Sequence, residues 1–123
     1  MKSRLVTASA ALGLAVAFAT AASAAAVNGK AIYDDNCLAC HQATGAGMPP
    51  TFPALKGSKV VTGPKPVVLA TVLNGRGAMP SWKSQFNDAQ VAAVTTYIRS
   101  SWGNKAPAVT VAEAAAARKG KLR

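Results

Sequence analysis

The stretch Cys37-Leu38-Ala39-Cys40-His41 contains both cysteines and the one histidine of the 123-residue chain. Two thiols separated by two residues and followed directly by an imidazole form the C-x-x-C-H pattern, which is typical of a c-type haem attachment site. The thiols of Cys37 and Cys40 suit addition to the two vinyl groups of a porphyrin, and His41 suits one axial position of its iron. The stretch therefore predicts one covalently bound haem c.

Three other uses of these residues are open. A closed zinc site needs four ligands, and the chain has no further cysteine or histidine. A thioredoxin-like dithiol follows a strand in a βαβ unit, whereas residues 27–36 are predicted to be helical. A structural disulfide would close a loop too short to restrain the unfolded chain much. Haem attachment is the use that the pattern favours.

A methionine thioether is a suitable second axial ligand to a histidine-bound haem iron. Met48 follows His41 by only seven residues and precedes two prolines, so the chain would have to round the haem edge almost at once. Met79 lies 38 residues beyond His41, in Asn74-Gly75-Arg76-Gly77-Ala78-Met79-Pro80, where two glycines allow the backbone to approach a flat ligand closely. We expect Met79 to bind the iron and Met48 to fill the core.

Residues 1–24 read as a segment of their own. Two basic residues are followed by an uncharged run that ends in Ala22-Ser23-Ala24, the pattern of a secretory signal peptide with a small-residue cleavage site. Cleavage after Ala26 would serve as well. An uncleaved membrane anchor is the alternative, because no charged residue lies between Arg4 and Lys30 and a long uncharged run can span a bilayer. The signal predicts a periplasmic protein with no membrane span once it has been cleaved.

Without residues 1–24, the chain has a lower net charge and fewer apolar residues with which to build a core. The formal charge falls from +10 to +8, and only 27 apolar residues larger than alanine remain for the 99 residues from 25 to 123. That is a thin core for a domain of this size, so a bound group is expected to fill its centre. Nucleic-acid binding is disfavoured, since the basic residues are scattered without interleaved aromatics and the chain is predicted to be exported.

Three further stretches carry a family resemblance. Together with Cys37 to His41, the stretches Phe52-Pro53-Ala54-Leu55, Asn74 to Pro80 and Tyr97-Ile98-Arg99 resemble class I monohaem cytochromes c over about residues 28–103. Within that family the chain is similar to bacterial periplasmic carriers and to cytochrome subunits of dehydrogenases. The resemblance implies an all-α fold in which three to four helices and their loops surround one haem, with residues 25–103 as the cytochrome domain.

The same resemblance implies roles for four residues. The carbonyl of Pro53 accepts a hydrogen bond from His41, and Leu55 lies against the porphyrin. The loop that carries Arg76 and Trp82 runs near the haem propionates. For Arg76 the alternative is equally open, namely that its side chain is an ordinary solvated charge and not a partner of the propionates.

Local patterns predict where the helices lie. Asn28 caps a first helix that runs through Cys40, and the glycine- and proline-rich residues 42–64 form a loop on the His side. Pro66 begins a buried helix that stops at Asn74-Gly75, with a buried strand as the rival for this apolar run. Asn87 and Gln90 approximate a capping box for a helix with Val91, Val94, Ile98 and Trp102 on one face, ending at Gly103. This helix is implied to cross the first near Gly29, with Tyr33 in contact with Tyr97.

Residues 104–123 form an alanine- and lysine-rich tail. Thr110 and Glu113 form a capping box for a short helix to Arg118, which is marginal alone and is expected to dock loosely or fray. A contact arm for a partner is the alternative.

An iron bound by both His41 and Met79 has no position for oxygen or substrate, which predicts an electron carrier rather than an enzyme. The alternatives are a dedicated cytochrome subunit of a periplasmic dehydrogenase and, with Met79 off the iron, a peroxidase or gas sensor. The carrier would be a monomer or one subunit of a heterodimer, passing electrons from a dehydrogenase to a terminal oxidase or another acceptor. Acidic partners of this kind would be steered by a ring of lysines: Lys30, Lys56, Lys59, Lys65, Lys83 and Lys105.

Overall fold

The computed structural model describes residues 26–122, so both interpretations of residues 1–24 lie outside the described residues. Within this range the chain is helical and has no strand, which confirms the all-α prediction. None of the helices described is long and apolar enough to cross a bilayer. The helices are α1 (Gly29–Asn36), α2 (Leu38–His41), α3 (Lys59–Thr62), α4 (Lys65–Asn74), α5 (Asp88–Ser100) and α6 (Val111–Arg118).

The predicted first helix is divided in two. Asn28 caps α1 as expected, with its side-chain oxygen accepting from the Ala31 N–H at 3.1 Å. The helix then ends at Asn36, whose side-chain amide donates to the Ile32 carbonyl at 2.9 Å, and such local bonds compete with the helical ladder. A separate turn, α2, carries the second half of the cysteine motif. The break therefore sets Cys40 and His41 on a different axis from α1.

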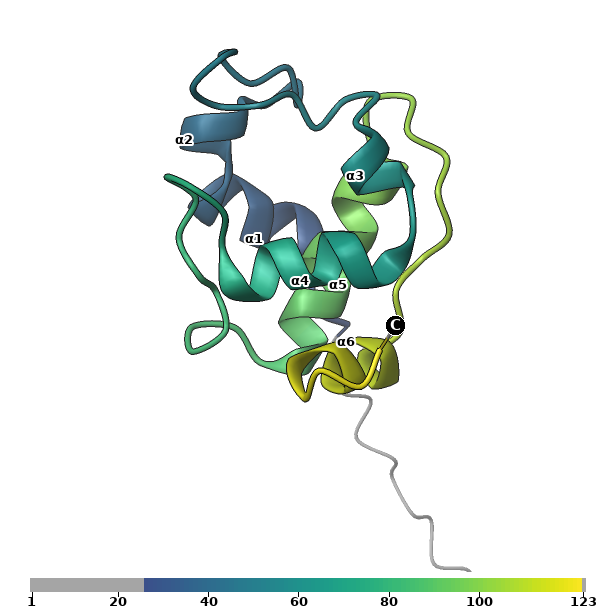
Figure 1. The fold of residues 1–123 in the computed structure, drawn as a ribbon. Helices are drawn as coiled ribbons and strands as arrows, with labels where there is room; N and C mark the ends of the chain where they lie inside the picture. The colour runs from purple at the N-terminus through teal and green to yellow at the C-terminus, as the bar shows by residue number, and fades with distance from the viewer. Residues whose placement is uncertain (1–25, 123) are drawn as a thin grey trace, which may run out of the picture.

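The crossing of α1 and α5 agrees with the expected one. A side chain at Gly29 would collide with the Ala93 carbonyl of α5, so the two backbones are in contact there. Tyr33 is fully buried, and its ring centroid lies 5.3 Å from that of Tyr97. Figure 1 shows α5 running behind α4, with α1 and α2 on its left.

The helix predicted from Pro66 is α4, and its four buried residues make it a core element: Val68, Leu69, Val72 and Leu73. This excludes the strand alternative. The capping box of α5 is complete, with reciprocal bonds of 2.9 Å between Asn87 and Gln90. However, α5 ends at Ser100, and Trp102 adopts a left-handed backbone (φ 55°), so Trp102 does not continue the helical face. The segment predicted as loop also contains one helical turn, α3.

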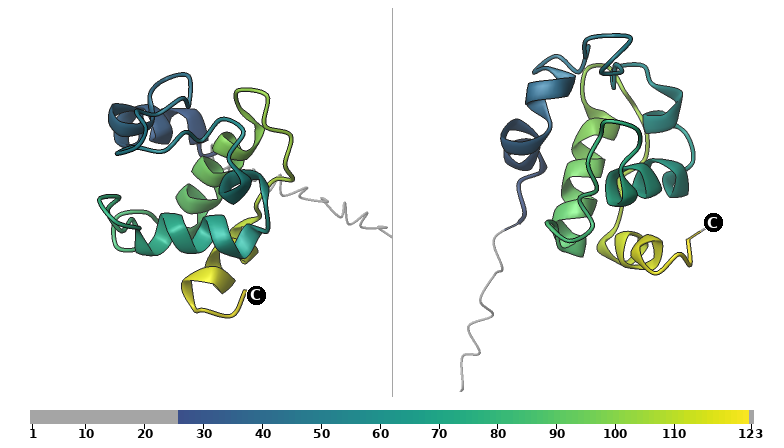
Figure 2. Two further views of the ribbon diagram at one scale, coloured as in Figure 1. Left: turned by 45° about the horizontal axis from the view of Figure 1, so that its top comes forward. Right: turned by 60° about the vertical axis from the view of Figure 1, so that its left-hand side comes forward.

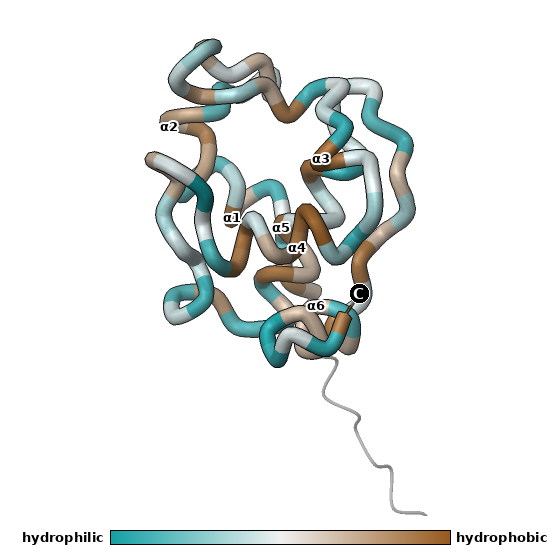
Figure 3. The backbone as a smooth tube through the Cα atoms, viewed as in Figure 1, coloured by the Kyte–Doolittle hydropathy of each residue, from teal (hydrophilic) through white to brown (hydrophobic). Residues whose placement is uncertain are grey.

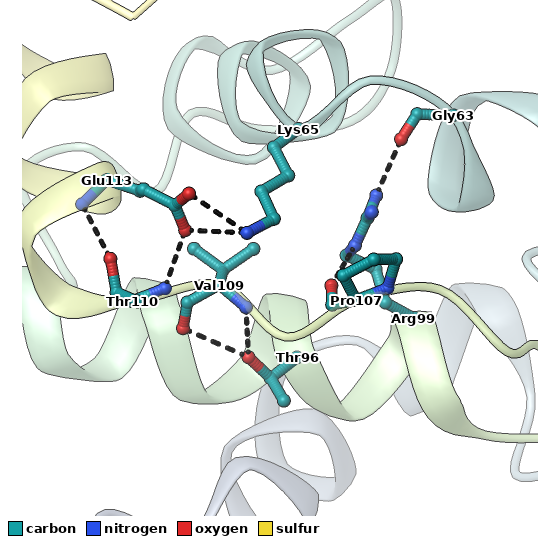
Figure 4. Close-up of polar contacts among 8 residues, drawn as sticks. All are labelled: Gly63, Lys65, Thr96, Arg99, Pro107, Val109, Thr110 and Glu113. Atoms are coloured by element: carbon teal, nitrogen blue, oxygen red, sulfur yellow. Dashed lines mark hydrogen bonds and ion pairs between the residues drawn. The ribbon is translucent and has the colours of Figure 1, made fainter.

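The C-terminal tail docks closely, and the expectation of a loose or frayed tail is wrong. Ala114 of α6 is fully buried, and Lys65 of α4 donates to both carboxylate oxygens of Glu113 at 2.9 Å. Figure 4 shows this pair beside the bonds that join Val109 to Thr96 of α5. In Figure 1 and both views of Figure 2, α6 lies across one end of the molecule, under α4 and α5. Lys119 and Lys121 are exposed, as expected.

A buried arginine ties the tail to the middle of the chain. Arg99 of α5 is 2% exposed and donates to the carbonyls of Val61, Gly63 and Pro107. Figure 3 shows hydrophobic stretches, in brown, along α3, α4 and α5. Buried residues of these three helices belong to the hydrophobic core, and some of them line the site described next.

Candidate haem-binding site

A cavity of about 480 Å³ opens between α1, α4, α5 and two loops, residues 42–58 and 75–87. Its volume is within the usual range for small-molecule sites. Its walls are mostly apolar and include Val68, Val94 and Ile98. Every residue that the sequence predicted for the site lines this cavity: Cys37, Cys40, His41, Pro53, Leu55, Arg76, Met79 and Trp82. The fold therefore brings together residues that are up to 45 positions apart in the chain.

His41 is buried at 8% exposure, and its Nδ1 lies 2.9 Å from the carbonyl oxygen of Pro53. A carbonyl only accepts hydrogen bonds, so Nδ1 carries the ring hydrogen and Nε2 keeps the lone pair that a metal requires. The bond implied by the family resemblance is thus present in the structure. It fixes both the tautomer and the orientation of the imidazole.

Cys37 lies at the break between α1 and α2, Cys40 lies within α2, and their sulfurs are not bonded to each other. Burial, and next the neighbouring Cys40, raise the pKa of the Cys37 thiol to about 11. A thiol of this kind is protonated at neutral pH, whereas dithiol catalysts need a thiol whose pKa is lowered. Cys37 consequently does not have the lowered pKa that such a catalyst needs.

Residues 42–58, which we call the His-side loop, arch over the top of the molecule in Figure 1. The Tyr33 hydroxyl donates to the Gln42 carbonyl at 2.6 Å, and the Leu55 N–H donates to the Gly45 carbonyl at 2.8 Å. Gly45 is buried with φ +66°, and a Cβ there would run into the ring of Trp102. The loop is thus packed tightly against residues on both sides of the sequence motif.

Asn104 joins the His-side loop to the end of α5. Its side-chain amide donates to the carbonyls of Leu55 (3.1 Å) and Ile98 (2.9 Å), and its oxygen accepts from the Gly57 N–H at 2.9 Å. The residue is 6% exposed, so water does not compete for these bonds. Asn104 therefore supports the segment that carries Pro53 and Leu55, although the sequence analysis placed it in the tail beyond the cytochrome domain.

Residues 75–87, which we call the Met-side loop, connect α4 to α5. Gly75 leaves α4 with φ +74°, and a Cβ there would meet the carbonyl oxygen of Met79. The backbones of Arg76 and Met79 exchange two hydrogen bonds of 3.0 and 3.1 Å, which turn the chain so that Met79 lines the cavity. Met48 is 47% exposed and does not line the cavity, so it is not the core residue that was expected.

The rest of the Met-side loop folds back on α4. The Ser81 hydroxyl donates to the Leu73 carbonyl at 2.6 Å, and the Lys83 N–H donates to the same carbonyl at 3.1 Å, which satisfies the open end of α4. Trp82 and Phe86 stack with ring centroids 4.8 Å apart, and both line the cavity. Phe86 is a wall residue that the sequence analysis did not single out.

Of the predicted ring of lysines, two are engaged in ion pairs. Lys30 pairs with Asp34 at 2.5 Å, and Lys65 pairs with Glu113. Four others are exposed: Lys56, Lys59, Lys83 and Lys105. Among residues 26–122, no three side chains of the His, Cys, Asp and Glu types cluster as a metal site would require. The sulfurs and imidazole of the cavity suit an iron bound within a porphyrin rather than a bare ion.

Comparison with known proteins agrees with this geometry. A family model described as "Cytochrome C oxidase, cbb3-type, subunit III" matches residues 24–98, which is more than half of the chain. The chain belongs to the class I cytochrome c family. Membership implies haem c as the group that the cavity holds. Residues 99–122 of this cytochrome c, including α6, lie beyond the matched region.

Several relatives are cytochromes of different size. Cytochrome c6 of Leptolyngbya boryana is 38% identical over 77 residues, which cover 60% of this chain and 88% of that protein. The cytochrome c subunit of the quinone alcohol dehydrogenase of Gluconacetobacter polyoxogenes is 35% identical over 100 residues (72% of this chain, 21% of the subunit). CcoP of the cbb3-type oxidase of Azospirillum brasilense is 38% identical over 90 residues (68% and 30%). This cytochrome c thus spans less than a third of the two larger relatives.

Proposed function

We propose that this cytochrome c carries single electrons between redox proteins on one haem, attached by thioether bonds through Cys37 and Cys40 and ligated by His41 and Met79. The observation that carries the proposal is that all four side chains line one apolar cavity. Haem, when bound, supplies a one-electron couple at its iron.

Each residue has a distinct task in this proposal. Cys37 and Cys40 fix one edge of the porphyrin to the break between α1 and α2. His41 presents Nε2, because Pro53 holds its Nδ1 hydrogen at 2.9 Å. Met79 supplies a soft sulfur from the opposite loop, and a His/Met pair favours a high reduction potential. If His41 and Met79 both held the iron, neither oxygen nor a substrate would have access to the metal.

The walls of the cavity set the environment of the electron. Leu55, Val68 and Phe86 exclude water, and an apolar surrounding disfavours the extra positive charge of the oxidised state. Arg76 and Trp82 line the same cavity and are proposed as partners of the propionates. Electrons would pass at the exposed edge near Cys40, with the four exposed lysines steering acidic partners.

The cytochrome is proposed to act in the periplasm, following cleavage of residues 1–24. A dedicated cytochrome subunit of a dehydrogenase is the second candidate, and the likeness to subunits of alcohol and gluconate dehydrogenases favours it. Both candidates share the same haem site and differ only in whether the partner is transient. Co-purification with a catalytic chain would support the subunit, whereas a monomer in gel filtration would support the free carrier.

The ligands are tested with Met79→Ala and Met48→Ala as a matched pair. In the wild type we expect haem that stays with the denatured chain and, in the oxidised form, the weak near-infrared band of a methionine–iron bond. Met79→Ala should keep the haem but lose this band and lower the reduction potential, and Met48→Ala should change neither. Loss of the band in Met48→Ala alone would overturn the assignment. An open sixth site in the wild type would favour a peroxidase or gas sensor.

A further inference from the structure

The tail reaches the Met-side loop through one side chain, Arg118, in the last turn of α6. This residue lies beyond residues 24–98, the part of the chain that the family model matches. Its side chain is 23% exposed, which is low for an arginine. The capping box of α6 and the buried Ala114 hold the helix in place, so Arg118 extends from a fixed support.

The guanidinium group of Arg118 binds three oxygens at once. Nε donates to the Asp88 carboxylate at 2.6 Å, Nη2 donates to the Phe86 carbonyl at 2.6 Å, and Nη1 donates to the Lys83 carbonyl. The planar fork of arginine suits several acceptors held in fixed positions, and lysine cannot reproduce it. Two of the acceptors belong to the Met-side loop, and the third begins α5. A single charged group thus joins α6 to the closing half of this loop.

This half of the loop forms part of the cavity wall. Phe86 stacks on Trp82, and Trp82 is itself tied to α4 by an N–H bond of 3.2 Å to the Val72 carbonyl. The loop is therefore held by two supports, the end of α4 and Arg118. Met79 lies between Gly75, which is bonded to α4, and Lys83, which is bonded to both α4 and Arg118. Releasing Arg118 would remove one of the two supports on the Lys83 side of Met79 and leave the loop held by α4 alone.

We propose that Arg118 is a positioning residue that holds the Met-side loop closed over the cavity and so keeps Met79 in place as the sixth ligand. The inference rests on the proposed function, because it takes Met79 as an axial ligand. A contact made only when the loop is closed raises the population of the closed form, and its loss raises the population of the open one.

Two variants separate this role from a general docking of α6. Arg118→Gln removes the contact with the Met-side loop. Lys65→Gln is its matched control. Lys65 also ties α6 to the body of the protein, through its pair with Glu113, but it belongs to α4 and not to the Met-side loop. Asp88→Asn removes only the ion pair and leaves both carbonyl bonds of Arg118, so its effect should be the smaller. Arg118→Lys keeps the charge and loses the fork.

The test is a titration of the oxidised full-length holoproteins with imidazole, followed by the visible spectrum and the near-infrared methionine–iron band. Added imidazole takes the sixth position only when the loop is open, so its apparent Kd falls as the open fraction rises. We expect the apparent Kd to fall about tenfold in Arg118→Gln and to change less than about twofold in Lys65→Gln. Arg118→Lys should lie between Arg118→Gln and the wild type.

The outcomes are distinguishable. A wild type without the methionine–iron band would overturn the proposed function and this inference with it. A wild type with the band, together with an Arg118→Gln variant that binds imidazole as the wild type does, would overturn the inference alone. Equal shifts in Arg118→Gln and Lys65→Gln would also overturn it, because they would assign the effect to α6 docking as a whole. Should Arg118→Gln fail to fold, Arg118→Lys and Asp88→Asn are measured against the same control.

Discussion

The His-side and Met-side loops face each other across the same cavity but are held by different means. The His-side loop is closed by Asn104, a neutral amide that is 6% exposed and bonded to backbone groups only. The Met-side loop is closed by Arg118, a charged group that is 23% exposed. Buried neutral bonds are protected from water and salt, whereas a partly exposed charged contact is screened by both. The Met side is therefore expected to open first.

This difference suits the two proposed ligands. His41 lies on α2 next to the cysteines, so the proposed covalent attachment would fix its position together with Pro53. Met79 is separated from α4 by only a few residues, and in the proposal its own sulfur would be its one attachment to the haem. Local opening takes place where buried contacts are fewest, so exchange of the sixth ligand is expected through the Met side.

The largest effect is expected from removing the haem attachment, because both loops pack around the cavity that the haem is proposed to fill. Replacing Cys37 and Cys40 by serine should abolish haem attachment and, with it, cooperative unfolding, because both loops pack around a cavity that the chain cannot fill by itself. Far-ultraviolet circular dichroism and thermal unfolding of the purified variant would measure this. A stably folded apo-protein would contradict the view that the haem supplies the centre of the core.

The next largest effect is expected from replacing one glycine in each loop by alanine and comparing the two losses of stability. Gly45 and Gly77 both have positive φ, but a Cβ at Gly45 meets the ring of Trp102, whereas one at Gly77 meets nothing within 4 Å. Gly45→Ala should lower the free energy of unfolding by about 3 kcal/mol, from backbone strain and overpacking together. Gly77→Ala should cost about 1 kcal/mol, from backbone strain alone. Denaturant unfolding measures both, and equal costs would remove the packing difference between the loops.

Asn104→Ala should cost about 2 kcal/mol, because it leaves the Leu55 and Ile98 carbonyls and the Gly57 N–H without this partner. The methionine–iron band should persist, since these groups belong to the His side. The exposed Asn74 provides a control, and Asn74→Ala should stay within about 0.5 kcal/mol of the wild type. Loss of the band in Asn104→Ala would show that the two loops are coupled rather than independently held.

Short sequence signals predicted much of this site. The cysteine motif, the Asn28 cap, the capping boxes at Asn87 and Thr110, and the Gly75 turn are local patterns, and the structure contains each of them. All of the predicted site residues line the cavity because local motifs and the family resemblance both depend on spacing along the chain. Their tasks as ligands and contacts of the haem stay predictions.

The features that the sequence analysis missed depend on contacts between distant residues. Arg118 reaches the Lys83 carbonyl 35 positions away, and Asn104 reaches Leu55 across 49. Neither acceptor is a side chain, so no pattern of residue types could indicate the pairing. The break at Cys37 was missed because Asn36 is compatible with a helix, and only its bond to the Ile32 carbonyl marks the end of α1.

The smallest expected effect concerns pH and the support of the Met side. The Thr110 N–H, and next the Lys65 ammonium, hold the pKa of Glu113 below its ordinary value of 4.5. A lowered pKa means that the contact stabilises the folded state above the ordinary pKa, and that this contribution is lost as the pH falls through the lowered one. The difference in Tm between the wild type and Glu113→Gln should therefore be largest at neutral pH and vanish at acid pH.

Glu113 supports α6 without touching the Met-side loop. The imidazole Kd should therefore depend on the contacts of Arg118 and not on the protonation of Glu113. A Kd that changed in parallel with the protonation of Glu113 would place the weak point of the Met side in the docking of α6 rather than in Arg118.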